Sequence, residues 1–129
     1  MLEHFLVMTD DIDATRDFYQ DVLDFREGFR ADLGFAGYWL YLDDVPVIHI
    51  AEWDSYTLHS KNEGIPVTSP GQSTGAFDHV AFNGTNAQEM IDKLTRMNIP
   101  FHRNDVPVAR LIQLFLSDPN GVKIELNYR

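Results

Sequence analysis

Four side chains that can bind a metal ion recur at matching positions in the two halves of the sequence. His4 and His79 each stand near the start of an apolar stretch, whereas His49 and Glu125 each stand near the end of one. His4 and His79 are 75 residues apart, and His49 and Glu125 are 76 residues apart. Imidazole nitrogens and carboxylate oxygens are ligands for divalent metals. The spacing indicates two similar halves whose polar residues could converge on one metal.

The first half of the chain is predicted to form one strand, one helix and three further strands. Apolar residues within 12–25 recur at three- and four-residue spacings, which is typical of a helix with one apolar face. The preceding Thr9-Asp10-Asp11 supplies side-chain oxygens for the N-cap of this helix. Short apolar runs predict strands over residues 2–8, 26–30, 37–42 and 45–51.

The second half repeats this order of elements. Asn86, followed three positions later by Glu89, predicts the start of a helix that ends by Pro100. Strands are predicted over residues 77–82, 101–103, 111–116 and 122–128, with Asp118-Pro119-Asn120-Gly121 as a reverse turn between the last two. Residues 52–76 between the halves are rich in Ser, Thr, Gly, Pro and charged residues, which predicts a long connection.

These elements predict a single α+β domain over residues 1–129. It contains two βαβββ modules, residues 1–52 and 77–129, joined by a connecting loop over residues 53–76. One four-stranded module cannot bury its sheet face alone. We therefore expect the two modules to pair into one curved mixed sheet around a metal-binding cavity, with the helices outside.

The composition excludes several functions. The chain has no cysteine, so any metal must take nitrogen and oxygen ligands. The formal net charge of −10 would repel nucleic acid and anionic membranes, and we expect neither as a partner. The first residues lack the features of a signal peptide, and no apolar run is long enough to span a bilayer. We expect a cytoplasmic protein.

Four sequence motifs carry a family resemblance that covers nearly the whole chain outside the 52–76 connection. They are Leu2-Glu3-His4-Phe5, Asp17-Phe18-Tyr19-Gln20-Asp21-Val22-Leu23-Asp24-Phe25, Phe77-Asp78-His79-Val80-Ala81-Phe82 and Asp118-Pro119-Asn120-Gly121-Val122-Lys123-Ile124-Glu125-Leu126. With these motifs the sequence resembles the vicinal oxygen chelate superfamily, which includes glyoxalase I, methylmalonyl-CoA epimerase, fosfomycin-modifying enzymes, bleomycin resistance proteins and extradiol ring-cleaving dioxygenases.

The resemblance implies a metal centre. His4, His79 and Glu125 fall on the metal-ligand positions of the family, where they would form a face of two histidines and one carboxylate. Such a face leaves coordination positions open for a substrate with two adjacent oxygens. Iron(II) or manganese(II) is the favoured ion, and nickel or zinc is also compatible. The alternative for each histidine is a side chain held by ordinary hydrogen bonds.

His49 decides between two branches of the family. Glyoxalase I-like members carry a fourth ligand on the corresponding strand, commonly a carboxylate or glutamine, whereas extradiol dioxygenases carry a histidine that acts as acid or base. Imidazole can serve in both roles. We assign His49 as the catalytic acid or base, because a histidine there matches the dioxygenase branch better. The third interpretation is a histidine that lines the cavity and is neither a metal ligand nor an acid or base.

Two further residues are candidates for substrate binding. Phe115 occupies the place where ring-cleaving dioxygenases carry a tyrosine, and it has no hydroxyl for a bound catecholate. Arg110, just before the 111–116 strand, could reach an anionic substrate, or it could be an ordinary exposed arginine. His59 and His102 lie in polar segments and are predicted to be surface histidines.

The resulting hypothesis is a metal-dependent enzyme with dioxygenase-like chemistry on a small vicinal diol or hydroxycarbonyl. The first alternative is a glyoxalase I-like or epimerase-like lyase or isomerase in which all four residues bind the metal. The second is a ligand-binding protein of the bleomycin-resistance kind without catalysis. The resemblance also implies a homodimer and a small-molecule substrate.

Overall fold

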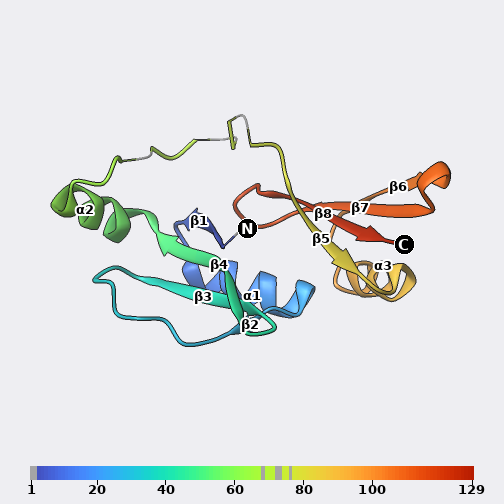
Figure 1. Ribbon diagram of the computed structural model, residues 1–129, viewed down its shortest axis with the longest axis horizontal. Coiled ribbons are helices and arrows are strands. Elements are labelled where there is room, and N and C mark those ends of the chain that lie inside the picture. Colours follow the sequence, from blue (N-terminus) through green and yellow to red (C-terminus); the bar gives the residue numbers. More distant parts are fainter. Residues whose placement is uncertain (1–2, 68, 72–73, 76) are drawn as a thin grey trace. The chain divides into compact units, whose positions relative to one another are not determined.

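The chain forms two compact units, residues 1–71 and 72–129, in a computed structural model that describes residues 3–67, 69–71, 74–75 and 77–129 (Figure 1). Each unit contains one βαβββ module with its own four-stranded mixed sheet. The predicted α+β class and the two repeated modules are therefore confirmed. The predicted pairing of the modules around one cavity stays a prediction.

The sheet of the first unit has the strand order β1-β4-β3-β2. β1 is parallel to β4, and the other neighbours are antiparallel. The elements are β1 (Phe5–Thr9), α1 (Ile12–Leu23), β2 (Arg26–Glu27), β3 (Gly37–Leu42) and β4 (Val45–Glu52), followed by α2 (Trp53–Glu63).

Helix α1 begins at the predicted cap. The Asp11 side chain accepts a hydrogen bond from the Ala14 N–H at 2.9 Å, which satisfies one of the free donors of the first turn. Asp24 ends the helix in a left-handed conformation. The helix packs on β3 and β4, and its buried residues Tyr19 and Val22 lie in the core of this unit.

The two faces of this sheet differ in chemistry because side chains alternate along each strand. Tyr38 on β3 donates a hydrogen bond to Asp13 on α1, so Tyr38 and its register partner Ile50 point toward the helix. Trp39 and its register partner His49 consequently lie on the opposite face of the sheet. The sheet thereby presents His49 away from α1.

The second unit repeats this topology with the strand order β5-β8-β7-β6. β5 is parallel to β8, and the remaining pairs are antiparallel. The elements are β5 (Val80–Gly84), α3 (Ala87–Arg96), β6 (His102–Val106), the 3₁₀ turn η1 (Pro107–Ala109), β7 (Leu111–Ser117) and β8 (Lys123–Tyr128).

Helix α3 also begins at its predicted cap. The Asn86 side chain accepts from the Glu89 N–H at 3.2 Å, and its amide donates to the Glu89 carboxylate at 3.3 Å. The helix ends at Arg96, four residues before Pro100, because Asn98 turns the chain with a positive φ. Leu94 is fully buried and anchors the helix.

The structure differs from the sequence prediction in the segment 53–76, where α2 occupies residues 53–63. The Glu52 side chain caps α2 by accepting from the Ser55 N–H at 3.2 Å, and Gly64 ends the helix in a left-handed conformation. The prediction missed α2 because Ser60 is its one buried residue, so no apolar stripe marks it. A capping side chain also explains why Glu52 stands at the end of β4.

Strand boundaries differ in smaller ways. The predicted strand 26–30 is shortened to β2, because after Gly28 the backbone leaves the ladder. β1 and β5 each begin one residue after the predicted ligands His4 and His79. Leu2 of the first predicted strand lies outside the described residues. Among the helices of the described chain, none has the length and apolarity needed to cross a membrane.

Candidate metal centre

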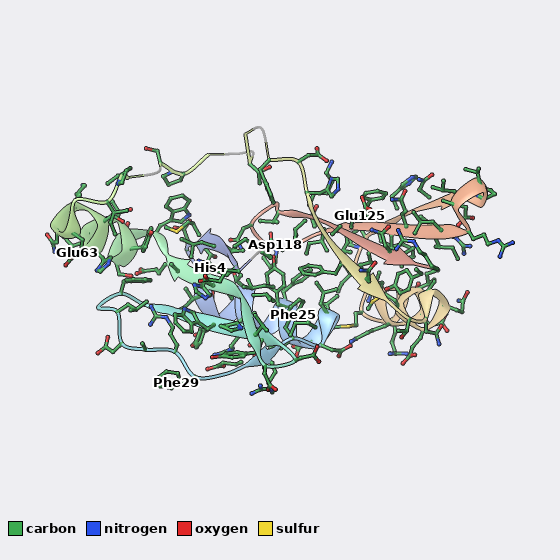
Figure 2. The ribbon with its side chains drawn as sticks, in the orientation of Figure 1. His4, Phe25, Phe29, Glu63, Asp118 and Glu125 are labelled. Atoms are coloured by element: carbon green, nitrogen blue, oxygen red, sulfur yellow. The ribbon has the colours of Figure 1, made fainter. Side chains whose placement is uncertain are left out.

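In the first unit, the two histidines predicted for the metal centre are in direct contact. His4 immediately precedes β1 and His49 lies on β4, and their rings are stacked with centroids 3.8 Å apart and planes 12° apart. Trp39, the register partner of His49 on β3, stacks on the other side of the His49 ring at 4.4 Å. His49 is therefore held between His4 and Trp39. Figure 2 shows His4 beside the sheet of this unit.

The environment of His49 keeps its imidazole neutral. Burial and, to a lesser extent, the neighbouring His4 lower the pKa of His49 from 6.5 to about 4, although Glu3 and a hydrogen bond with the Pro46 backbone act in the opposite direction. The Nε2 atom is buried and has no hydrogen-bond partner in the described part of the chain. A neutral imidazole with an unpartnered nitrogen is the form that binds a metal.

In the second unit, the predicted ligands His79 and Glu125 also meet. His79 immediately precedes β5, and its Nε2 lies 3.1 Å from the Glu125 Oε2 on β8. The register places Glu125 opposite Ala81 on β5, two residues after His79, so both side chains are on one face of the sheet. Glu125 is 9% exposed, which is unusual for a carboxylate.

Two amides fix the orientation of this carboxylate. Gln113 and Asn127 donate to the Glu125 Oε1 at 2.9 and 2.7 Å. The Gln113 amide is itself fixed, because its oxygen accepts a hydrogen bond from Asn104 at 2.7 Å. With Oε1 held in this way, Oε2 is the oxygen that faces His79 (Figure 2 labels Glu125). The arrangement suits a carboxylate that offers one oxygen to a metal.

An acidic side chain directly precedes each N-terminal histidine of the two modules and contacts its ring. Asp78 Oδ2 lies 2.7 Å from the His79 Nδ1, and Glu3 Oε1 lies 3.1 Å from the His4 Nδ1. Lys123 in turn bonds to Asp78 at 2.8 Å, and these two contacts lower the pKa of Asp78. A carboxylate at Nδ1 orients the ring and leaves Nε2 as the nitrogen for a metal.

The two modules match in the surroundings of their late polar residues as well. Trp39 is the register partner of His49 on β3, and Phe115 is the register partner of Glu125 on β7. The Phe115 ring packs edge-on to His79, with centroids 6.4 Å apart. Phe115 thus lies beside the candidate ligands. Its role in substrate binding stays a prediction.

The structure brings the four predicted residues together as two pairs, one in each unit. Within residues 3–67, 69–71, 74–75 and 77–129, no group of three or more metal-binding side chains is assembled. The donors present nevertheless fit a divalent metal, because each pair offers nitrogen or carboxylate oxygen, and the buried Nε2 of His49 lacks a partner. Convergence of both pairs on one ion stays a prediction.

Arg110 is not near these residues. It is exposed and caps η1 in a left-handed conformation at the start of β7, whereas Phe115 lies near the other end of the strand. Five steps along an extended chain separate the two residues, or about 17 Å. Lys123, by contrast, bonds to Asp78, which contacts the His79 ring.

Sequence reasoning missed the supporting residues Glu3, Asp78, Gln113, Asn127 and Lys123. One signal was present for the first two, because an acidic residue stands directly before a histidine in both modules. Gln113 and Asn127 gave no such signal. They meet Glu125 only through the register of β7 and β8.

Two βαβββ modules with polar pairs at matching places define a repeated-module α+β fold. A sequence model of the Glyoxalase/Bleomycin resistance protein/Dioxygenase superfamily matches residues 1–126. The chain belongs to this superfamily, and the predicted resemblance is confirmed.

Solved structures of low sequence identity share the fold. Lactoylglutathione lyase from Agrobacterium tumefaciens is 17% identical with a TM-score of 0.75, and the match covers 99% of this chain and 92% of that protein. The fosfomycin resistance protein FosX from Listeria monocytogenes is 13% identical with a TM-score of 0.73, over 100% and 93% of the two chains. A glyoxylase/bleomycin resistance protein/dioxygenase domain from Frankia is 17% identical with a TM-score of 0.71, over 99% and 90%. No curated protein matches the sequence.

Proposed function

We propose that this protein is a metal-dependent enzyme in which His4, His79 and Glu125 bind one divalent ion. The observation that carries the proposal is the geometry at Glu125. Two amides hold its Oε1, its Oε2 faces the His79 Nε2 at 3.1 Å, and Asp78 orients the His79 ring from the other nitrogen. Such supporting contacts are typical of metal ligands.

His49 is the fourth ligand in this proposal. It holds the position in the first module that Glu125 holds in the second, opposite an aromatic residue of the neighbouring strand. Its buried and unpartnered Nε2 supports the same role. A catalytic acid or base works best when its pKa lies near the working pH. The pKa of His49 is about 4, so this side chain is a weak proton acceptor at neutral pH.

The chemistry that follows is proton transfer on a small substrate with two adjacent oxygens, of the lyase or isomerase type. A bound divalent metal supplies Lewis-acid polarisation of the two oxygens. The chain supplies the fixed donors that hold the ion, with Gln113 and Asn127 keeping the Glu125 carboxylate from rotating. Lactoylglutathione lyase activity and fosfomycin modification are the first two reactions to assay, because proteins with those names share the fold.

A second candidate is oxygen-dependent cleavage of a vicinal diol, with iron(II) or manganese(II) as the metal and His49 as acid or base. It is favoured by a histidine, rather than a carboxylate, at position 49. Phe115 argues against oxygen-dependent cleavage, because this residue offers no hydroxyl to a bound catecholate. Oxygen uptake in the presence of catechols separates the two candidates.

Elemental analysis of protein purified without added metal tests the proposal. We expect near-stoichiometric iron, manganese, nickel or zinc in the wild type and its loss in Glu125→Gln, which keeps the size of the side chain. Glu63→Gln is the matched control, because it removes the same charge from the exposed end of α2. If the wild type binds none of these ions on reconstitution, the protein is a ligand-binding member of the superfamily instead.

Two properties of the assembly belong to the proposal. We expect a homodimer and a soluble small-molecule substrate, as the family resemblance implies. Light scattering coupled to size-exclusion chromatography measures the first. A monomer with full metal content would show that metal binding does not require dimerisation.

A further inference from the structure

An open cavity of about 350 Å³ lies at one end of the sheet of the second unit. Its lining includes Phe101 just before β6, His102 at the start of β6, Phe115 and Ser117 on β7, and Lys123 at the start of β8. The cavity is therefore formed by three neighbouring strands. It combines two aromatic rings with an imidazole, a hydroxyl and an ammonium group.

The cavity opens on the face of the sheet that carries Glu125. His102 is the register partner of Phe115, and Phe115 is the register partner of Glu125. Ser117 and Lys123 form the next pair on the same face, because each lies two residues from Phe115 or Glu125 along its strand. The cavity and the candidate metal ligand thus share one surface.

Two lining residues also contact the groups around His79. The Phe115 ring packs edge-on to the His79 ring, and the Lys123 Nζ bonds to Asp78, which holds the His79 Nδ1. A molecule in the cavity would therefore contact two side chains that themselves contact His79 and Asp78. The ammonium group of Lys123 has three donors, so it can bond to an anion while it keeps Asp78.

We propose that this cavity binds the organic part of the substrate, a planar aromatic or conjugated group that carries an anionic substituent. The inference rests on the proposed metal centre and adds the chemical class of its ligand. Phe115 provides the flat apolar contact. Lys123 provides charge recognition, with Ser117 and His102 as polar neighbours. Within a chain of net charge −10, this single lysine gives the cavity its preference for anions.

A matched pair of probe ligands tests the inference. Catechol and 3,4-dihydroxybenzoate offer the same two adjacent oxygens, and only the second carries a carboxylate. Isothermal titration of the metal-loaded protein is expected to show that 3,4-dihydroxybenzoate binds about fivefold more tightly. Lys123→Met should abolish this preference, so that the two ligands bind the metal-loaded variant with equal affinity. Lys61→Met, which removes the same charge from exposed α2, should keep it.

A second variant fills the cavity. Ser117 is exposed at the end of β7, so Ser117→Trp places an indole in the cavity without removing a buried group. We expect at least tenfold weaker binding of both ligands with unchanged metal content. Equal affinities of the two ligands for the wild type, or a preference that survives Lys123→Met, would overturn the inference.

Metal content is measured separately on every variant, so that failure of the proposed metal-dependent function can be distinguished from failure of the cavity assignment. A wild type that binds metal and catechol but shows no anion preference overturns the cavity assignment alone. A wild type that binds no metal overturns the proposed function. The cavity is then tested with benzoate against phenol on the metal-free protein, where loss of a benzoate preference in Lys123→Met supports the assignment and its persistence overturns it.

Discussion

The ring of His49 lies parallel to that of His4, with centroids 3.8 Å apart, although 44 residues separate them in the chain. The contact arises because β1 is parallel to β4, with Leu6 opposite His49 in the register. His4, two residues before Leu6, falls on the same face of the sheet. The pairing puts an early and a late polar residue of one module into contact, as His79 and Glu125 are in the other.

Replacement of His49 by alanine distinguishes a ligand from an acid or base. With His49 as fourth ligand, His49→Ala is expected to weaken metal affinity about tenfold or more, because one coordinate bond is lost. Competition with a chelator of known affinity measures this change. His59→Ala, on α2, is the control and should leave the affinity unchanged. Full metal affinity with lost turnover would instead assign His49 as acid or base.

Asp78→Asn tests the orientation of His79. The amide keeps the size of the side chain but loses the charge that holds the His79 Nδ1 at 2.7 Å. We expect metal affinity to fall about tenfold, at the lower end of the usual effect of such supporting contacts. Asp105→Asn removes another exposed carboxylate that bonds to a cation, Arg103, and should have no effect. Equal affinities of the two variants would exclude an orienting role.

Tyr128 gives the protein a defined sensitivity to alkali. Burial raises the pKa of its phenol from 10.0 to about 12, and the side chain is 6% exposed. Between pH 10 and 12 the unfolded chain loses this proton while the folded chain keeps it, so stability falls as pH rises. The loss reaches about 2 to 3 kcal/mol at pH 12. Urea unfolding across this range should show a smaller loss in Tyr128→Phe, and parallel curves would contradict the prediction.

The N-cap of α1 makes a measurable contribution to stability. Asp11→Ala removes the acceptor of the Ala14 N–H and is expected to lower the free energy of unfolding by about 1 kcal/mol. Asp10→Ala is the control, because this exposed neighbour loses the same charge without capping the helix. Urea denaturation compares the three proteins. Equal losses in both variants would point to net charge rather than capping.

Much of the fold follows from local patterns. Both βαβββ modules, the caps Asp11 and Asn86, and strand β3 were predicted from periodicity and capping residues, which are interactions between near neighbours in the chain. Helix α2 was not predicted, because it has no apolar stripe. It forms on a cap at Glu52 and a left-handed glycine, which are weaker signals than a buried face.

The sequence by itself determined the residue types of the candidate centre and their repeat. His4, His49, His79 and Glu125 were all identified from spacing and family motifs. Only the tertiary structure decided that Gln113 and Asn127 hold the Glu125 carboxylate, and that Lys123 bonds to Asp78 next to His79. The physical reason is that these contacts depend on strand register. Strand register pairs residues that are distant in the chain. The local sequence around each paired residue shows no periodic pattern that indicates its partner.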